Sequence, residues 1–171
     1  IAPDGESAPE AIERFQRDKA QLMISLDFDQ ELGTFSLTRL PSLEMVLVAS
    51  HLHPLSAGSG IEKDQLLVHL ELVVKDTAPR FADQPRGSFM GTQHVIYLPD
   101  FHAKRLALVE GIGFGWIPRH IIETDLAEGG LVLLDLVGGN TWTYHPRLVH
   151  RSTEPLGPAG MQLAADLKAA F

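Results

Sequence analysis

The chain has 171 residues, of which 44% are hydrophobic and 21% charged, a composition typical of a folded globular protein. Its 14 lysines and arginines are outnumbered by 22 acidic residues, so the chain by itself is a poor candidate for DNA contact. It has no cysteine, which excludes disulfides and thiolate metal sites, and no apolar run approaches the roughly 20 residues that a membrane-spanning helix needs.

Apolar and turn-forming residues predict a chain in which strands and helices alternate. Ser7 and Glu10 have the spacing of a capping box, and Asp100 is expected to cap a further helix that Gly111 ends. In chain order, the patterns predict a helix at 8–19, strands at 22–28, 35–40 and 44–50, a short helix at 61–69, a strand at 70–75, an extended loop over 76–93, a strand at 94–98, a helix at 101–110, a strand at 113–118, a helix at 119–128, strands at 131–137 and 141–151, and a last helix at 158–171. This alternation favours an α/β fold with mostly parallel sheets and helices on their faces.

Three glycines follow the helix predicted at 101–110, and their spacing is similar to that of a dinucleotide-binding loop. They are Gly111, Gly113 and Gly115. Such a loop needs the order strand, glycines, helix, whereas these glycines follow a helix and enter a strand. We therefore interpret Gly111 as a helix stop and the other two glycines as positions of close backbone packing.

Little in the sequence favours metal or catalytic chemistry. His51 and His53 share a strand face and His145 and His150 point oppositely, but neither pair has the helical spacing and nearby carboxylate of a typical zinc site. The run Gly58-Ser59-Gly60 lacks the spacing of a nucleophile elbow. We expect no bound metal, no cofactor and no enzymatic activity.

Four stretches of the chain carry a resemblance to a known family. Two are specific in order and separation: Leu43–Leu55, which ends in a His-Pro-Leu turn, and Lys104–Pro118, which contains Leu-Val-Glu-Gly-Ile-Gly-Phe-Gly-Trp-Ile-Pro and precedes Gly129-Gly-Leu-Val-Leu-Leu134. Ala20–Leu26 and Pro155–Gly160 match more loosely, and Gln21 replaces the family's usual aspartate. Together these stretches resemble the effector-binding domain of LysR-type transcriptional regulators.

The resemblance implies a periplasmic-binding-protein-like fold of type 2. Two Rossmann-like lobes would be joined by two crossing strands, which act as a hinge near Ser50 and Thr143. Lobe I would hold residues 1–49 and 143–171, and lobe II would hold residues 50–142. The family's N-terminal winged helix-turn-helix has no counterpart in this sequence, nor do the first strand and helix of lobe I.

The candidate effector-binding residues lie at strand ends and at the hinge. Ligands of open α/β sheets bind outside the carboxyl ends of strands, and helix N-termini attract anions. The candidates are Ser50 and His51 at the hinge, Lys75 and Thr77 after one lobe II strand, Asp100 and Phe101 after the next, and Phe114 as an apolar wall. The carboxylate of Asp100 argues against a simple anion, because it can itself cap the free amides.

On this interpretation the chain is the ligand-sensing domain of a bacterial, cytoplasmic LysR-type transcription factor. A small effector, such as an organic or aromatic acid, would bind between the lobes and change the arrangement of attached DNA-binding domains. The chain would form a homodimer or homotetramer, contact DNA only through the missing domain and bind no membrane. Ile12 and Phe15 would lie either in the dimer contact or in the core. The alternatives are a periplasmic solute-binding protein and a small α/β enzyme.

Overall fold

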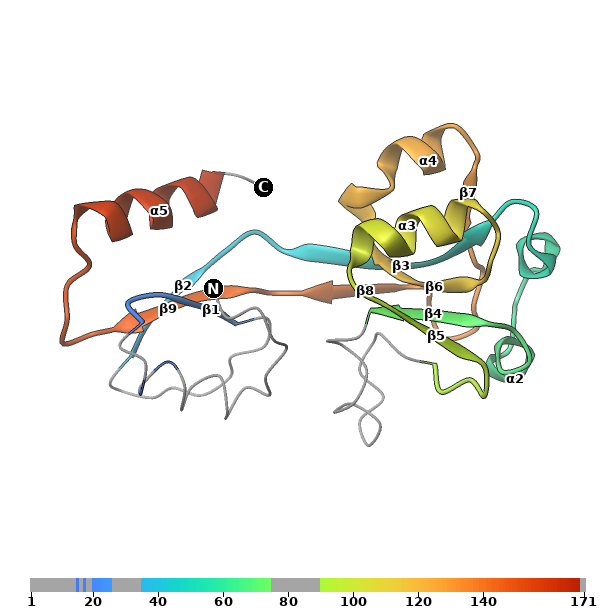
Figure 1. Ribbon diagram of the computed structural model, residues 1–171, viewed down its shortest axis with the longest axis horizontal. Helices are drawn as coiled ribbons and strands as arrows, with labels where there is room; N and C mark the ends of the chain where they lie inside the picture. The colour runs from blue at the N-terminus through green and yellow to red at the C-terminus, as the bar shows by residue number, and fades with distance from the viewer. Residues whose placement is uncertain (1–14, 16, 18–19, 26–34, 75–89, 170–171) are drawn as a thin grey trace. The chain divides into compact units, whose positions relative to one another are not determined.

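A computed structural model of the chain describes residues 15, 17, 20–25, 35–74 and 90–169 (Figure 1). Contacts within the chain divide it into two compact units, each with its own sheet. Unit 1 comprises Ile1–Leu43 and Thr143–Phe171, and unit 2 comprises Glu44–Trp142. Residues 44–49, assigned to lobe I from the sequence, belong to unit 2, and Met45–Ala49 pair with β6.

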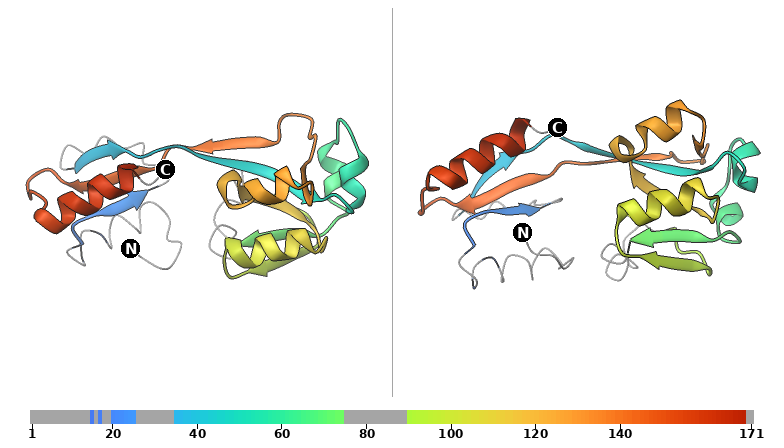
Figure 2. Two further views of the ribbon diagram at one scale, coloured as in Figure 1. Left: turned by 90° about the horizontal axis from the view of Figure 1, so that it is seen from above. Right: turned by 45° about the horizontal axis from the view of Figure 1, so that its top comes forward.

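The described residues of unit 1 include a three-stranded sheet and a helix of 12 residues. Its strands β1 (Met23–Ser25), β9 (Arg147–Arg151) and β2 (Phe35–Arg39) lie in that order, and both pairings are antiparallel. The helix α5 (Pro158–Ala169) runs alongside this sheet (Figure 2). None of its residues is fully buried. Among the described residues of the unit, the buried apolar side chains are those of Leu148 and Val149 on β9, Leu40 just after β2, and Phe15.

The helix predicted at 8–19 lies mostly outside the described residues. Phe15 and Arg17 are described, and both are helical. Phe15 is 4% exposed, and its ring lies 5.8 Å from the ring of Phe35 between centroids. The sequence did not decide whether Phe15 lies in the core or in a dimer contact, and the structure places it in the core of unit 1.

Unit 2 contains a mixed sheet with the strand order β5-β4-β6-β3-β7, and β8 pairs with β3. The strands β4, β5 and β6 run parallel, whereas β3 is antiparallel to β6 and β7. The strands are β3 (Leu43–Ser50), β4 (Glu71–Val74), β5 (Val95–Leu98), β6 (Phe114–Pro118), β7 (Leu131–Leu133) and β8 (Thr141–Tyr144). The short helices are η1 (Pro54–Ala57), α2 (Lys63–Leu66), α3 (Phe101–Val109), η3 (Arg119–Ile121) and α4 (Glu123–Ala127).

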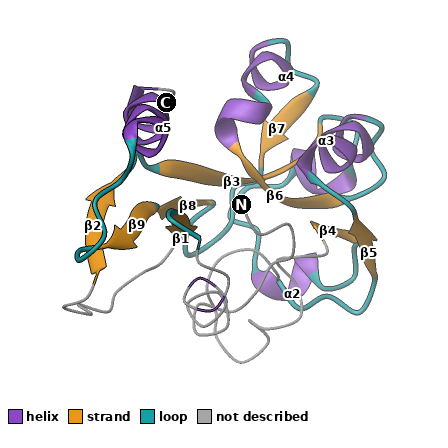
Figure 3. Cartoon of the chain, turned by 60° about the vertical axis from the view of Figure 1, so that its left-hand side comes forward, coloured by secondary structure: helices purple, strands orange, loops and turns teal. Residues whose placement is uncertain are grey.

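The core of unit 2 lies between its sheet and the helices α3 and α4. Figure 3 shows both helices on the same side of the sheet. Leu108 of α3 and Ile122, which directly precedes α4, pack with the strand residues Val48, Leu72 and Ile117, and all of these side chains are buried. The α/β class predicted from the sequence is confirmed.

Two glycines let α3 and β4 approach β6 closely. A Cβ atom on Gly113 would lie 2.3 Å from the carbonyl oxygen of Leu70, and one on Gly115 would lie 2.6 Å from that of Leu72. Gly111 has a φ of +71°, as a helix-ending residue requires. The predicted roles of all three glycines are confirmed.

The structure corrects several predictions of local structure. The expectation of mostly parallel sheets is wrong, because β9 inserts antiparallel between β1 and β2 and β3 runs against its neighbours in unit 2. The helix predicted at 119–128 is broken at Ile122, whose non-helical backbone brings its side chain into the core. The strand predicted at 141–151 divides around Pro146, which has no amide hydrogen to donate to a neighbouring strand.

Candidate functional site

The carboxyl ends of β4 and β5 define one edge of the unit 2 sheet. These parallel strands end at Val74 and Leu98, and α3 begins just after β5 at Phe101. Asp100 has an extended backbone, and its Oδ1 accepts a hydrogen bond of 2.8 Å from Ala103 N. The predicted N-cap is therefore confirmed, and its carboxylate satisfies one of the free amides of the first helical turn.

This carboxyl edge combines backbone donors with an aromatic side chain. Phe101 is half-buried and packs against the core of unit 2, so its ring has a fixed position beside the start of α3. Lys75 and Thr77, predicted to extend the same edge beyond β4, lie outside the described residues. The edge has the chemistry to hold a polar organic molecule against backbone amides.

Three other candidate residues lie at the opposite edge of the sheet. Because β3 is antiparallel to β6, its last residues lie beside the first residue of β6, and Ala49 is the partner of Phe114. Ser50 and His51 therefore lie at the amino edge of β4 and β6, away from Asp100. The five described candidates do not form one cluster within unit 2.

The contacts at the amino edge are structural. Phe114 is completely buried and cannot form the wall of a ligand site without rearrangement. Ser50 is also buried, and its Oγ lies 3.4 Å from Leu52 N, from which it accepts a weak hydrogen bond. The His51 amide donates to Gly130 O at 3.1 Å, and its Nδ1 lies 3.2 Å from the same oxygen. These residues fix the turn that follows β3.

A buried lysine lies beneath α3, and sequence reasoning missed it. Lys104 is only 2% exposed, and its side chain lies over Gly115, where a Cβ atom would be 3.0 Å from the lysine Nζ. Burial lowers the pKa of Lys104 to about 7, and the negative charge of Glu71 partly opposes this shift. The signal was present in the sequence, because Lys104 precedes the inward-facing Ala107 and Leu108 by three and four positions.

A second buried ionisable group fixes the segment that leads into β5. Glu71 is completely buried, and its carboxylate accepts hydrogen bonds from Met90 N at 2.7 Å and from Thr92 Oγ1 at 3.2 Å. Burial raises the pKa of Glu71, whereas these hydrogen bonds and the charge of Lys104 oppose the rise. Glu71 therefore anchors the described end of the connection between β4 and β5.

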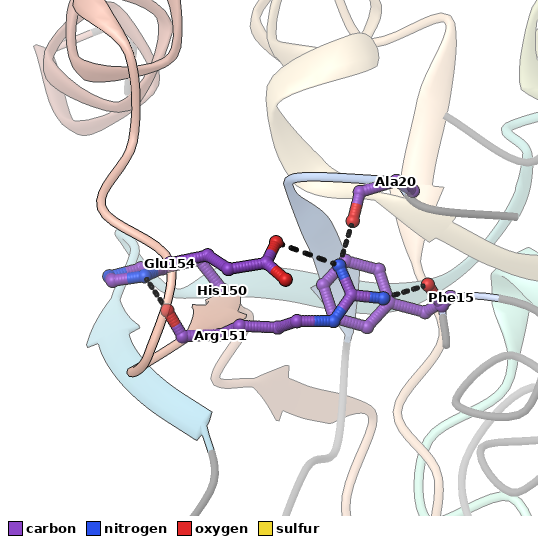
Figure 4. Close-up of polar contacts among 5 residues, drawn as sticks. All are labelled: Phe15, Ala20, His150, Arg151 and Glu154. Carbon is purple, nitrogen blue, oxygen red and sulfur yellow. Dashed lines mark hydrogen bonds and ion pairs between the residues drawn. The ribbon is translucent and has the colours of Figure 1, made fainter. Parts of the chain in front are cut away.

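The most elaborate polar cluster of unit 1 surrounds Arg151 (Figure 4). Its guanidinium donates to Ala20 O at 2.9 Å and to Phe15 O at 2.8 Å, and it lies 3.7 Å from Glu154 Oε2. The guanidinium carbon also lies 4.8 Å from the centre of the Phe15 ring. Arg151 thus joins the end of β9 to the segment that precedes β1. His150 Nδ1 donates to the Arg151 carbonyl at 3.1 Å.

A serine–histidine pair in unit 1 bears on the enzyme alternative. Ser42 Oγ lies 2.9 Å from His145 Nδ1, and both residues are exposed. A catalytic pair needs a third group to orient the histidine. Within the described part of the chain, no carboxylate forms a hydrogen bond with His145. Among the residues that the structure describes, the pair thus lacks the third group of a catalytic arrangement.

In the ranges that the structure describes, no three His, Cys, Asp or Glu side chains lie close enough to hold a metal ion. No helix among those residues is both long and apolar enough to cross a bilayer.

Comparisons with solved structures identify the fold. The regulatory domain of CcmR from Synechocystis PCC6803 in complex with 2-PG is 18% identical, with a TM-score of 0.66 over 94% of this chain and 78% of that one. Full-length LysG from Corynebacterium glutamicum with bound effector Arg is 13% identical, with a TM-score of 0.72 over 96% of this chain and 56% of that one. The predicted periplasmic-binding-protein-like fold of type 2 is confirmed by this likeness to LysR regulatory domains.

Sequence comparisons agree with the fold. The uncharacterized HTH-type transcriptional regulator YeeY of Escherichia coli (strain K12) is 28% identical over 99 residues, which are 57% of this chain. The matched region is only 32% of that regulator's length. The model of the family described as LysR substrate binding domain matches residues 5–171. The chain therefore belongs to the LysR substrate binding domain family.

Proposed function

We propose that this chain senses a small organic effector for a bacterial LysR-type transcription regulator. The observation that carries the proposal is the family match over residues 5–171. Two similar structures contain small molecules, 2-PG in one and the effector Arg in the other. The family match favours a regulator over a free solute-binding protein. A regulator of transcription acts where the chromosome lies, which supports a cytoplasmic location.

The carboxyl edge of the unit 2 sheet is the part of the effector site that we propose in this unit. It comprises Asp100, Phe101 and the first amides of α3, together with Lys75 and Thr77. Phe101 would provide an apolar surface and the backbone amides would donate hydrogen bonds to the polar end of the ligand. Ser50, His51 and Phe114 would act indirectly, by maintaining the fold of the opposite edge.

The consequence of binding would be a shift between conformational states. A ligand changes such an equilibrium only by its difference in affinity for the two states. Relatives that are longer than this chain include an HTH-type regulator, so the shift would be transmitted to DNA-binding domains outside the present sequence. Regulation of this kind needs no catalysis, and we propose that the chain is not an enzyme.

A thermal-shift screen tests the sensing function. The compounds are small organic and aromatic carboxylates, amino acids and phosphorylated acids. A ligand at about 100 times its dissociation constant should stabilise the folded state by about 2.7 kcal/mol, which raises the melting temperature by a few degrees. Phe101→Ala, Lys75→Ala and Thr77→Val should each lose most of this shift. A hit that all three variants bind as tightly as the parent would place the site elsewhere.

We further propose that the chain self-associates through α3. Leu106 and Val109 on α3 and Ile112 just after it recur at intervals of three residues, and they are 51%, 37% and 49% exposed. Ile96, on the edge strand β5 beside α3, is also exposed. A second copy of the same face, related by a two-fold axis, would bury this apolar surface against itself.

A further inference from the structure

Two histidines of unit 2 lie in contact although they belong to different turns of the chain. His53 follows β3 and precedes η1, whereas His69 follows α2, and their ring centroids lie 5.0 Å apart in an edge-to-face arrangement. His53 is only 8% exposed. The backbone of His69 is held at the end of α2 by a hydrogen bond of 3.0 Å from its amide to Leu66 O. The histidine pair therefore joins the turn after β3 to the end of α2.

The ring of His53 makes a second contact, which requires a neutral imidazole. His53 is the N-cap of η1, and its Nδ1 accepts a hydrogen bond of 3.2 Å from Leu55 N. A backbone amide can only donate, so Nδ1 must carry a lone pair, and the ring proton of the neutral form lies on Nε2. Protonation of His53 places a second N–H donor on Nδ1, opposite the Leu55 amide. The cap is therefore lost in the charged form.

This cap is part of a compact hydrogen-bonded turn. Ser56 Oγ donates to the carbonyl oxygens of His51 and His53, and both distances are 2.7 Å. His53 N donates to Ser50 O at 2.9 Å. Leu55, whose amide binds the His53 ring, is itself buried. Loss of the acceptor would leave that amide without a partner, which destabilises the turn.

The surroundings of His53 oppose its protonation. Burial lowers the pKa of His53, and the charge of His69 lowers it further. Among the other ionisable groups of these elements, the Nδ1 of His51 lies 3.2 Å from Gly130 O, and the carboxylate of Glu71 binds the segment that leads into β5. The charged side chains of α2 and its N-cap are exposed, namely Glu62, Lys63 and Asp64. His53 therefore stays neutral near pH 7 and takes up a proton only in acid.

We propose that His53 and His69 form an acid-sensitive switch in the turn after β3. With both rings neutral, His53 caps η1 and contacts His69. In acid, protonation of His53 removes the acceptor of the Leu55 amide, and a charge on His69 adds repulsion between the rings. The turn then separates from the end of α2. This inference goes beyond the proposed sensing function, because it makes the conformation of this turn depend on pH whether or not an effector is bound.

An NMR titration of the complete chain from about pH 8 to about pH 5 tests the switch. The nitrogen shifts of the His53 ring should show the Nε2–H tautomer at the start and a midpoint of protonation below 6.5, the ordinary pKa of histidine. The amide proton of Leu55 should shift with the same midpoint, because it loses its acceptor in the same step. A Leu55 amide that does not respond to protonation of His53 would overturn the proposal, as would a His53 ring that stays neutral to the end of the titration.

Two variants separate the cap from the charge. His53→Asn keeps a side-chain acceptor for the Leu55 amide but does not titrate, so the shift of that amide should become independent of pH. His69→Gln removes the neighbouring positive charge, so the midpoint of His53 should rise. An unchanged midpoint in His69→Gln would show that the two rings do not act as a pair.

Thermal unfolding gives a second readout with a matched control. Between the lowered pKa of His53 and 6.5, the unfolded chain binds more protons than the folded chain, so the melting temperature should fall as the pH drops through this interval. The fall should be smaller by a few degrees in His53→Asn. His102→Gln also removes one histidine, but from an exposed position on α3, and it should follow the parent. An identical pH dependence in His53→Asn and the parent would contradict the switch.

Discussion

Single residues of unit 2 show how closely α3 packs against its sheet. Gly115 leaves the space that the side chain of Lys104 occupies, and the Leu72 carbonyl lies on the other side of the same space. A side chain at Gly115 and a charge at Lys104 are therefore two perturbations of one contact.

Gly115→Ala should destabilise the chain by about 1–3 kcal/mol, the usual cost of overpacking a core. The added Cβ atom would lie 2.6 Å from Leu72 O, and backbone cannot move away as easily as a flexible side chain. Gly157→Ala is the matched control, because a Cβ atom there would have no neighbour within 4 Å. Urea denaturation of both variants measures the difference, and equal stability would contradict this view of the packing.

Lys104 should make stability depend on alkaline pH. The pKa of Lys104 is about 7 in the folded chain, and an exposed lysine has an ordinary pKa of 10.5, so the unfolded state binds more protons between these limits. The free energy of unfolding should therefore rise with pH from about 7 to 10.5, by at most about 1.4 kcal/mol per pH unit from this group. Lys104→Met should remove this contribution and flatten the profile. An unchanged slope in denaturation experiments across this range would show that Lys104 titrates normally.

At the scale of elements, the bounds of helices and strands could be predicted from regular periodicity, whereas the pairing of strands could not. The predicted strands at 35–40, 44–50 and 94–98 and the helix at 101–110 agree with β2, β3, β5 and α3 to within about one residue, because each has a clear apolar pattern and a recognisable end. The direction of β3 depends on its partners, which are distant in sequence. This is why Ser50 and Phe114 were grouped with Asp100, from which the antiparallel pairing of β3 and β6 separates them.

The Arg151 cluster should be more important to unit 1 than an ordinary surface ion pair. Arg151→Met would leave two carbonyl oxygens without their charged donor, and hydrogen bonds to charged groups contribute about 1.5–3 kcal/mol each. Arg119→Met removes the exposed pair with Glu44 and should cost no more than about 1 kcal/mol. Thermal unfolding of the two variants provides the comparison. Equal losses would mean that the Phe15–Ala20 segment does not depend on Arg151.

If the chain self-associates through α3, a charge placed among its exposed apolar residues should weaken the dimer. Leu106→Glu should raise the dissociation constant of the dimer at least tenfold. In a two-fold contact between two α3 helices, the substitution places a carboxylate from each copy in the same apolar interface. Leu52→Glu is the control, because Leu52 is exposed in the turn after β3, away from α3. Sedimentation equilibrium gives both dissociation constants. A dimer that tolerates Leu106→Glu as well as Leu52→Glu must use another surface.

For the whole molecule, the family could be identified from the sequence because two long stretches match the family in both their residues and their separation along the chain. The arrangement of the candidate site could not, because the antiparallel register that pairs Ala49 with Phe114 joins segments far apart in the sequence and separates Ser50 and His51 from Asp100. No local pattern contains that information. Lys104 is an intermediate case, since helical periodicity alone could have indicated that it faces inward.

We propose above all that a small effector binds at the carboxyl edge formed by β4, β5 and the start of α3. Residue-resolved NMR titration of the chain with a compound from the thermal-shift screen tests it most directly. We predict saturable shifts at the amides of residues 99–104, their loss in Phe101→Ala, and little change at residues 50–53 on the opposite edge. Shifts concentrated at residues 50–53 with none at 99–104, or no saturable shift anywhere, would contradict the claim.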